Sequence, residues 1–188
     1  MEKTWIRGLS ALALALPATT MAQGLPDSSY GAAGLALQMP DYADDDGVAL
    51  NLRAGADLSD LGANLDLGGG SLWVEGELTQ TLVKPSYDFT VVDPVTGATD
   101  TTEYDVSVTT LGAYARYVYP VDPITLEGRL GLSYLSADVD GGGSDSDLGL
   151  DFGVGVGFDL THQIRGVVEY TILQSDVDHF GFTAQYAF

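Results

Sequence analysis

Charged side chains at alternate positions are the feature of this chain with the clearest chemical meaning. Beyond residue 22 the basic residues are Arg53, Lys84, Arg116, Arg129 and Arg165. Carboxylates recur near the four arginines, in segments where every second residue is apolar or small. Guanidinium and carboxylate groups satisfy each other's hydrogen bonds when both leave water, so this pattern predicts an interior network of ion pairs. The predicted members are Arg53, Asp57, Glu75, Glu77, Arg116, Glu127, Arg129, Asp151, Arg165 and Glu169.

An Asp-rich segment at residues 138–147 is the best candidate for metal binding. Asp138, Asp140, Asp145 and Asp147 flank a glycine triplet, and hard cations accept carboxylates arranged around flexible backbone. The segment lacks the Glu that closes an EF-hand loop, and other connections are equally acidic. We therefore interpret it as a solvated acidic loop and predict no metal. The glycines between residues 153 and 157 alternate as in a strand, without a following helix, so no nucleotide or other cofactor is predicted.

Catalysis has one candidate, His179 with Asp176 and Asp178, in the predicted last loop. The other histidine, His162, falls in a predicted tight turn at the opposite end. No Ser/His/acid arrangement can be built from these residues. The sequence therefore predicts a protein that is not an enzyme, and lipid modification by a loop histidine stays an alternative.

Eight segments with period-two alternation predict an all-β protein. In the fifth, Ile124, Leu126 and Leu130 share one face, and Glu127 and Arg129 share the other. The apolar faces are continuous and almost free of charge, which favours lipid outside and polar groups inside; a water-soluble barrel would reverse this arrangement. The predicted fold is an eight-stranded antiparallel up-and-down transmembrane β-barrel, with strands at residues 30–39, 48–58, 72–83, 108–119, 124–137, 148–160, 163–174 and 180–188.

The predicted connections alternate between long acidic loops and tight turns. The acidic ones are residues 41–47, 84–105, 138–147 and 175–179, and the tight ones are 120–123 and 161–162. Outer-membrane barrels have long external loops and short periplasmic turns, so the acidic loops are expected outside the cell. Residues 59–71 should form a short turn and are too long for one.

The first 22 residues predict a secretory signal peptide, and residues 23–188 the barrel domain. Lys3 and Arg7 precede a short apolar run, Pro17 and small residues, with cleavage expected after Ala22. Removal of this segment changes the net charge from −20 to −21, because it carries two basic residues and one acidic residue. Such an acidic chain is not expected to bind nucleic acid. It has no cysteine, so it has no disulfides.

The segments TTLGAYARYVYPVDPITLEGRLGLSYLSADV and DLGLDFGVGVGFDL, with the final FTAQYAF, resemble the small outer-membrane β-barrel family that includes the OmpA transmembrane domain and OmpX. The resemblance implies a place in the outer membrane of a Gram-negative bacterium, contact with its lipid, and insertion by the outer-membrane assembly machinery. In this family that machinery reads a last strand ending in an aromatic residue, here Phe188 with Tyr186.

The resemblance indicates little about activity, because such barrels have diverse functions. The preferred hypothesis is a structural or surface-interaction barrel with a lumen plugged by charge and an unidentified external ligand. The alternative is a narrow, cation-favouring porin.

Overall fold

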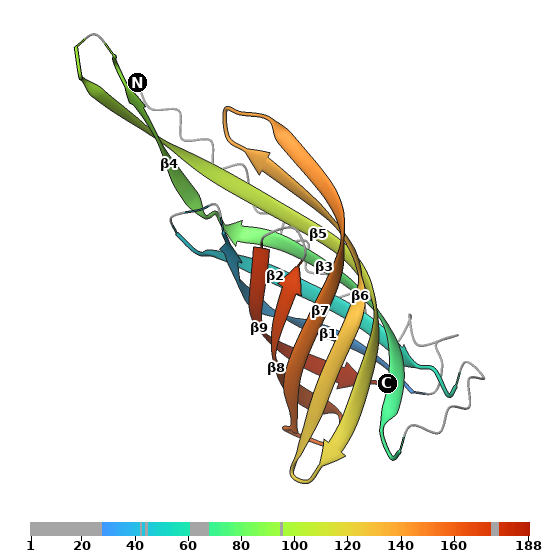
Figure 1. Ribbon diagram of the computed structural model, residues 1–188. Coiled ribbons are helices and arrows are strands. Elements are labelled where there is room, and N and C mark those ends of the chain that lie inside the picture. The colour runs from blue at the N-terminus through green and yellow to red at the C-terminus, as the bar shows by residue number, and fades with distance from the viewer. Residues whose placement is uncertain (1–27, 42, 44, 61–67, 95, 174–176) are drawn as a thin grey trace.

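The computed structural model of the protein describes residues 28–41, 43, 45–60, 68–94, 96–173 and 177–188 (Figure 1). These residues form nine strands. They are β1 (Ser29–Pro40), β2 (Gly47–Asp57), β3 (Ser71–Val83), β4 (Ser86–Val92), β5 (Thr99–Val121), β6 (Ile124–Val139), β7 (Ser144–Asp159), β8 (Ile164–Leu173) and β9 (Val177–Ala187). No helix long and apolar enough to cross a membrane occurs in the described part of the chain.

Eight of the strands close into a barrel, which confirms the predicted fold. All neighbours are antiparallel, in the order β3-β2-β1-β9-β8-β7-β6-β5, and pairing of β3 with β5 closes the ring. The ninth strand, β4, pairs with the beginning of β5. The long acidic connection predicted at residues 84–105 therefore contains strands that were not predicted. Its Tyr, Phe, Val and Thr residues favour strands, and they form a two-stranded ribbon that projects beyond the barrel (Figure 1).

The two tight turns and the loop at 138–147 follow the prediction with shifted boundaries, whereas residues 177–179 of the predicted loop at 175–179 belong to β9. Residues 122–123 and 160–163 are tight turns at one end of the barrel, and the end of β1, the beginning of β2 and residues 140–143 lie at the other end. We refer to these as the turn end and the loop end. The acidic loop at 138–147 is shorter than predicted, because Asp138 belongs to β6, and Asp145 and Asp147 belong to β7. Most of the long connection at 59–71 lies outside the described residues.

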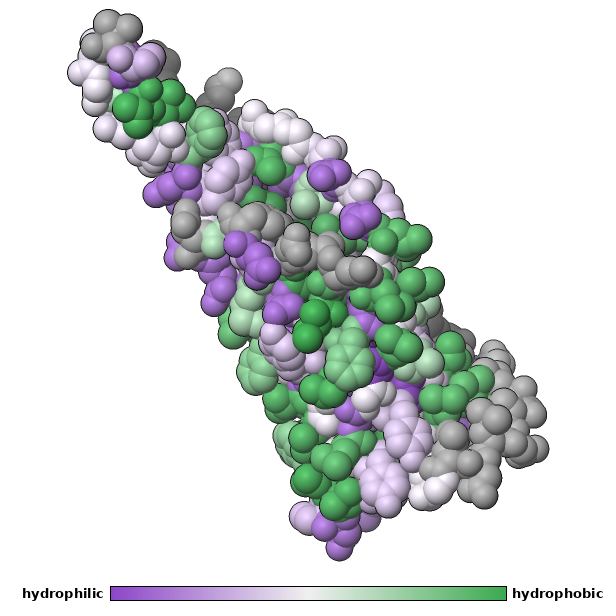
Figure 2. Space-filling model, in the orientation of Figure 1, coloured by the Kyte–Doolittle hydropathy of each residue, from purple (hydrophilic) through white to green (hydrophobic). Residues whose placement is uncertain are grey.

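The wall of the barrel presents apolar side chains to its surroundings, as the alternation predicts. Leu130 and Leu132 on β6 are each more than half exposed, whereas Glu127 and Arg129 on the same strand are buried. Green apolar side chains accordingly predominate along the wall in Figure 2. A barrel in water would hide these leucines and expose the charges, so the surface is suited to lipid.

The two faces exchange their character toward the loop end. On β5 the outward residues change from Leu111 to Ser107 and Asp105, while the inward ones change from Arg116 to Val108. An apolar cluster thus fills the loop end of the interior, formed by Val106, Val108, Leu135, Leu173 and Val177. Water replaces lipid around the wall at this level, so apolar residues turn inward and polar ones turn outward.

This exchange places Leu130 near the middle of the apolar band and Asp138 beyond it on the same face of β6. The substitution Leu130→Arg should lower the free energy of unfolding by about 2–4 kcal/mol, because a charge at the bilayer midplane loses its hydration. The matched variant Asp138→Arg should lower it by no more than about 1 kcal/mol. Urea titrations in lipid vesicles measure both, and equal losses would contradict the proposed position of the band.

Candidate functional site

The interior of the barrel holds a connected lattice of guanidinium and carboxylate groups. Arg53 on β2 and Arg129 on β6 both contact Glu77 on β3, with Nε of Arg53 2.7 Å and Nη1 of Arg129 2.6 Å from Oε2 of Glu77. Both arginines also contact Oε1 of Glu169 on β8, at 2.8 and 3.0 Å. Two cations from strands that are not neighbours therefore share two carboxylates inside the barrel.

A third arginine extends the lattice toward the turn end. Nη1 of Arg116 lies 3.3 Å from Oε2 of Glu75, and its Nη2 pairs with Glu127. Nη1 of Arg129 lies 3.1 Å from the other oxygen of Glu75, so this carboxylate links two of the arginines. Nη1 of Arg116 also donates a hydrogen bond to the hydroxyl of Tyr30, which in turn donates to Glu75. No side chain among these ion pairs is more than 4 % exposed.

Strand register explains how these residues meet. Arg53 is the cross-strand partner of Glu77, which pairs opposite charges directly. Arg116 is the partner of Arg129, an arrangement that would be repulsive on an isolated pair of strands. It is tolerated here because Glu75 reaches from β3 and contacts both guanidinium groups.

Glycines on the inward face provide the space that these long side chains occupy. A Cβ atom built at Gly153 would lie 2.9 Å from Cγ of Arg129. One built at Gly157 would lie 2.6 Å from Oε1 of Glu127. The alternating glycines of β7 therefore match the sequence interpretation that small residues face a crowded lumen.

Seven of the ten predicted network residues lie in this lattice, and three do not. Asp151 is buried but accepts a hydrogen bond from the hydroxyl of Tyr114, at 2.7 Å, and has no ion pair among the described contacts. Arg165 pairs with Asp159 at the turn end, where both side chains are partly exposed. Asp57 accepts a hydrogen bond from the backbone N–H of Ser59 at the end of β2.

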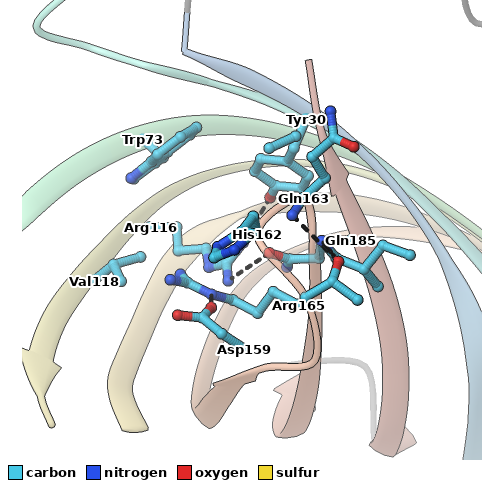
Figure 3. A pocket seen from close by; sticks show the side chains of 12 residues that line it. Tyr30, Trp73, Arg116, Val118, Asp159, His162, Gln163, Arg165 and Gln185 are labelled. Atoms are coloured by element: carbon cyan, nitrogen blue, oxygen red, sulfur yellow. Dashed lines mark hydrogen bonds and ion pairs between the residues drawn. The ribbon is translucent and has the colours of Figure 1, made fainter. Parts of the chain in front are cut away.

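Arg165 and Asp159 line a small cavity at the turn end, with a volume of about 180 Å³. Figure 3 shows Tyr30, Arg116, His162 and Gln185 among the side chains around it. The cavity adjoins the lattice, because Arg116 lines the cavity and also pairs with Glu75 and Glu127. The tight turn predicted for His162 is confirmed.

Neutral side chains that sequence reasoning did not select complete the lattice. Asn51 accepts from Nε of Arg53, and Thr171 accepts from Nη2 of Arg129, both at 2.8 Å. The guanidinium of Arg129 also lies 4.2 Å from the centre of the Tyr114 ring, a cation–π contact. The only available signal was strand parity, since Asn51, Tyr114 and Thr171 occupy the same alternate positions as the charges.

The placement of His179 in an exposed loop was wrong. It lies on β9, is 4 % exposed, and its Nε2 is 3.4 Å from Nε2 of Gln38 inside the barrel. Asp178 faces the other way and accepts a hydrogen bond from the hydroxyl of Tyr170. Neighbouring residues in a strand point to opposite faces, so His179 and Asp178 cannot act on one substrate from this backbone. Asp176, the other predicted partner, lies outside the described residues.

The acidic candidates for metal binding do not gather into a site. Within the described residues no group of three or more His, Cys, Asp or Glu side chains could hold a metal ion. Asp140 instead contacts Nζ of Lys84 at 2.6 Å.

Comparison with known proteins agrees with this geometry. The family model described as "Outer membrane protein beta-barrel domain" matches residues 8–188. No curated protein matches the chain.

Three solved structures are similar to the fold, with coverage given first for this chain and then for the other. Ail, the attachment invasion locus protein of Yersinia pestis, has a TM-score of 0.51 and 18 % identity over 87 % and 98 % of the chains. Neisserial surface protein A has a TM-score of 0.52 and 16 % sequence identity, and the match covers 86 % of this chain and 96 % of that one. The N-terminal β-barrel domain of Pseudomonas aeruginosa OprF has a TM-score of 0.52 and 11 % sequence identity, and the match covers 85 % of this chain and 97 % of that one.

A closed ring of eight antiparallel strands with an apolar outer wall and a charged interior defines an integral membrane β-barrel. The chain belongs to the outer membrane protein β-barrel domain family, whose model matches almost its whole length. It is a protein of the bacterial outer membrane.

The lattice predicts unequal effects of two arginine substitutions. Arg129→Gln should lower the free energy of unfolding by about 3–5 kcal/mol, because it leaves buried carboxylates without a cation. Arg165→Gln should lower it by no more than about 1 kcal/mol, because its pair with Asp159 is partly exposed to water. Urea unfolding of both variants in the same detergent is the measurement. Similar losses of unfolding free energy in the two variants would show that the buried lattice stabilises the barrel no more than the exposed ion pair does.

Proposed function

We propose that this barrel is closed to ions and has a structural or surface-interaction role at the loop end. The observation that supports the closed lumen is the presence of two successive barriers in the interior. The first is the arginine–glutamate lattice, and the second is the apolar cluster around Val106 and Val108. On β5 the inward residues pass from Arg116 to Val108 and Val106, so the lattice and the cluster lie at different depths.

The lattice opposes ion passage because its charged groups already bind one another. Glu75 and Glu77 each contact more than one guanidinium, and their side chains are at most 1 % exposed. A permeating cation would have to replace these arginines, and an eight-stranded barrel offers an interior just wide enough for its own side chains.

The apolar cluster opposes ion passage in a different way. It contains no charge, and Val108 and Val177 are fully buried. A hydrated ion entering such a constriction would lose water without gaining a polar ligand, which is how hydrophobic gates exclude ions.

The two ends of the barrel suit different partners. The loop end carries the acidic connections and the projecting ribbon, and we infer that it faces outside. At the turn end, Tyr186 and Phe188 are exposed with their rings 5.5 Å apart, edge to face. We infer that this pair lies at the membrane interface and serves as the recognition signal for outer-membrane assembly, as the family resemblance implies.

Single-channel recording of the folded protein in a planar bilayer tests the closed lumen. We expect no conductance steps, because both barriers lie across the lumen. Incorporation is checked by recovering a fluorescently labelled sample of the same protein from the membrane. Discrete, cation-selective steps from the incorporated protein would contradict the proposal and support the alternative of a narrow porin.

A further inference from the structure

The ribbon formed by β4 and residues 99–105 of β5 extends away from the barrel at the loop end (Figure 1). We call it the projecting ribbon. Seven cross-strand pairs hold it together, from Ser86 opposite Asp105 to Val92 opposite Thr99. A two-stranded ribbon alone in water is marginally stable, so its surface chemistry indicates what covers it.

Alternation gives the projecting ribbon one apolar and one acidic face. Residues directly opposite each other in a register share a face. The apolar face carries Tyr87, Tyr104, Phe89 and Val91, with Thr102 and Asp100 beside them. The acidic face carries Asp88, Glu103 and Asp105 together with the threonines at 90, 99 and 101.

The apolar face continues the core of the protein. Tyr87 packs against the buried cluster of Val106 and Val108, and its ring stacks on that of Tyr104 at 5.5 Å. Beyond this stack Phe89 is 54 % exposed and Val91 52 % exposed. Green apolar side chains accordingly appear on the ribbon in Figure 2. An exposed apolar surface that is continuous with a buried core is typical of a site that contacts another molecule.

The negative charge around the apolar face of the projecting ribbon indicates which kind of partner can bind there. Beyond the predicted signal peptide the only cationic side chain at the loop end is Lys84, and it is paired with Asp140. Asp88, Asp100, Glu103 and Asp105 are all exposed. A phosphate-bearing lipid or a second copy of this acidic chain would be repelled there, whereas a basic surface would be attracted.

We propose that the apolar face of the projecting ribbon binds a basic protein segment that carries apolar side chains. In the described sheet β4 pairs only with β5, so such a segment can also add as a strand along β4. This inference rests on the proposed surface-interaction role and names the surface and the class of partner.

A peptide of alternating composition tests the proposal. The probe is fluorescein-labelled Lys-Val-Lys-Phe-Lys-Val-Lys, titrated with the folded protein in phosphatidylcholine nanodiscs and followed by anisotropy. The double variant Phe89→Ser, Val91→Ser should weaken binding at least about tenfold, since apolar anchors dominate such contacts. The matched control is Val92→Ser, which removes an equally exposed apolar residue from the opposite face and should change affinity by less than about twofold.

Two further peptides separate the apolar and charge contributions. The Glu-for-Lys version of the probe should not bind, and the version with Ser at the Val and Phe positions should bind at least about tenfold more weakly. Equal binding of the serine peptide, or equal effects of the two protein variants, would overturn the proposal. Dimers in analytical ultracentrifugation that disappear in the double variant would also overturn it, by assigning the face to a second copy. None of these outcomes depends on whether the lumen conducts.

Discussion

The sharing of buried carboxylates among three arginines is the interaction on which the rest of this barrel depends. Glu75 and Glu77 lie on one strand, and the guanidinium groups that they contact come from β2, β5 and β6. Because ions inside the wall lose their hydration, each must find its counter-charge across the lumen. The lattice therefore joins distant parts of the ring by side chains, in addition to the backbone ladders that join neighbours.

Lipid surrounds one part of the barrel wall and water surrounds another, and the outward residues of the same strands differ accordingly. Along the membrane-facing part the wall exposes Leu130 and its neighbours, and the polar groups are gathered inside. Past the level of Leu111 the wall meets water, and the arrangement reverses within two or three residues on β5. The apolar cluster at the loop end is a consequence of this reversal, and the projecting ribbon extends the reversed pattern into the surrounding water.

Much of this could be predicted from alternation, since a period of two assigns every residue of a strand to a face. Arg53 and Glu169 were placed inside by parity alone, although 116 positions separate them in the chain. Parity does not give height along the barrel, so Arg165 and Asp57 were grouped with residues that the structure separates from them. Alternation was also not recognised where acidic residues are frequent. Asp100, Glu103 and Asp105 are typical of a loop, yet cross-strand pairing with β4 makes residues 99–105 part of a strand. His179 was misplaced for the same reason, because the acidic residues around it concealed the inward position that it occupies.

Access of a water-soluble reagent to the middle of the lumen tests the closed interior most directly. The chain has no cysteine, so Ser133→Cys introduces a single thiol at a buried, inward position of β6 between Arg129 and Leu135. The matched variant Ser144→Cys places a thiol at the exposed beginning of β7. With a charged methanethiosulfonate reagent added to the folded protein, we expect rapid modification at position 144 and modification at position 133 only after unfolding. Equal rates at the two positions would show that water and ions reach the lattice and that the lumen is open.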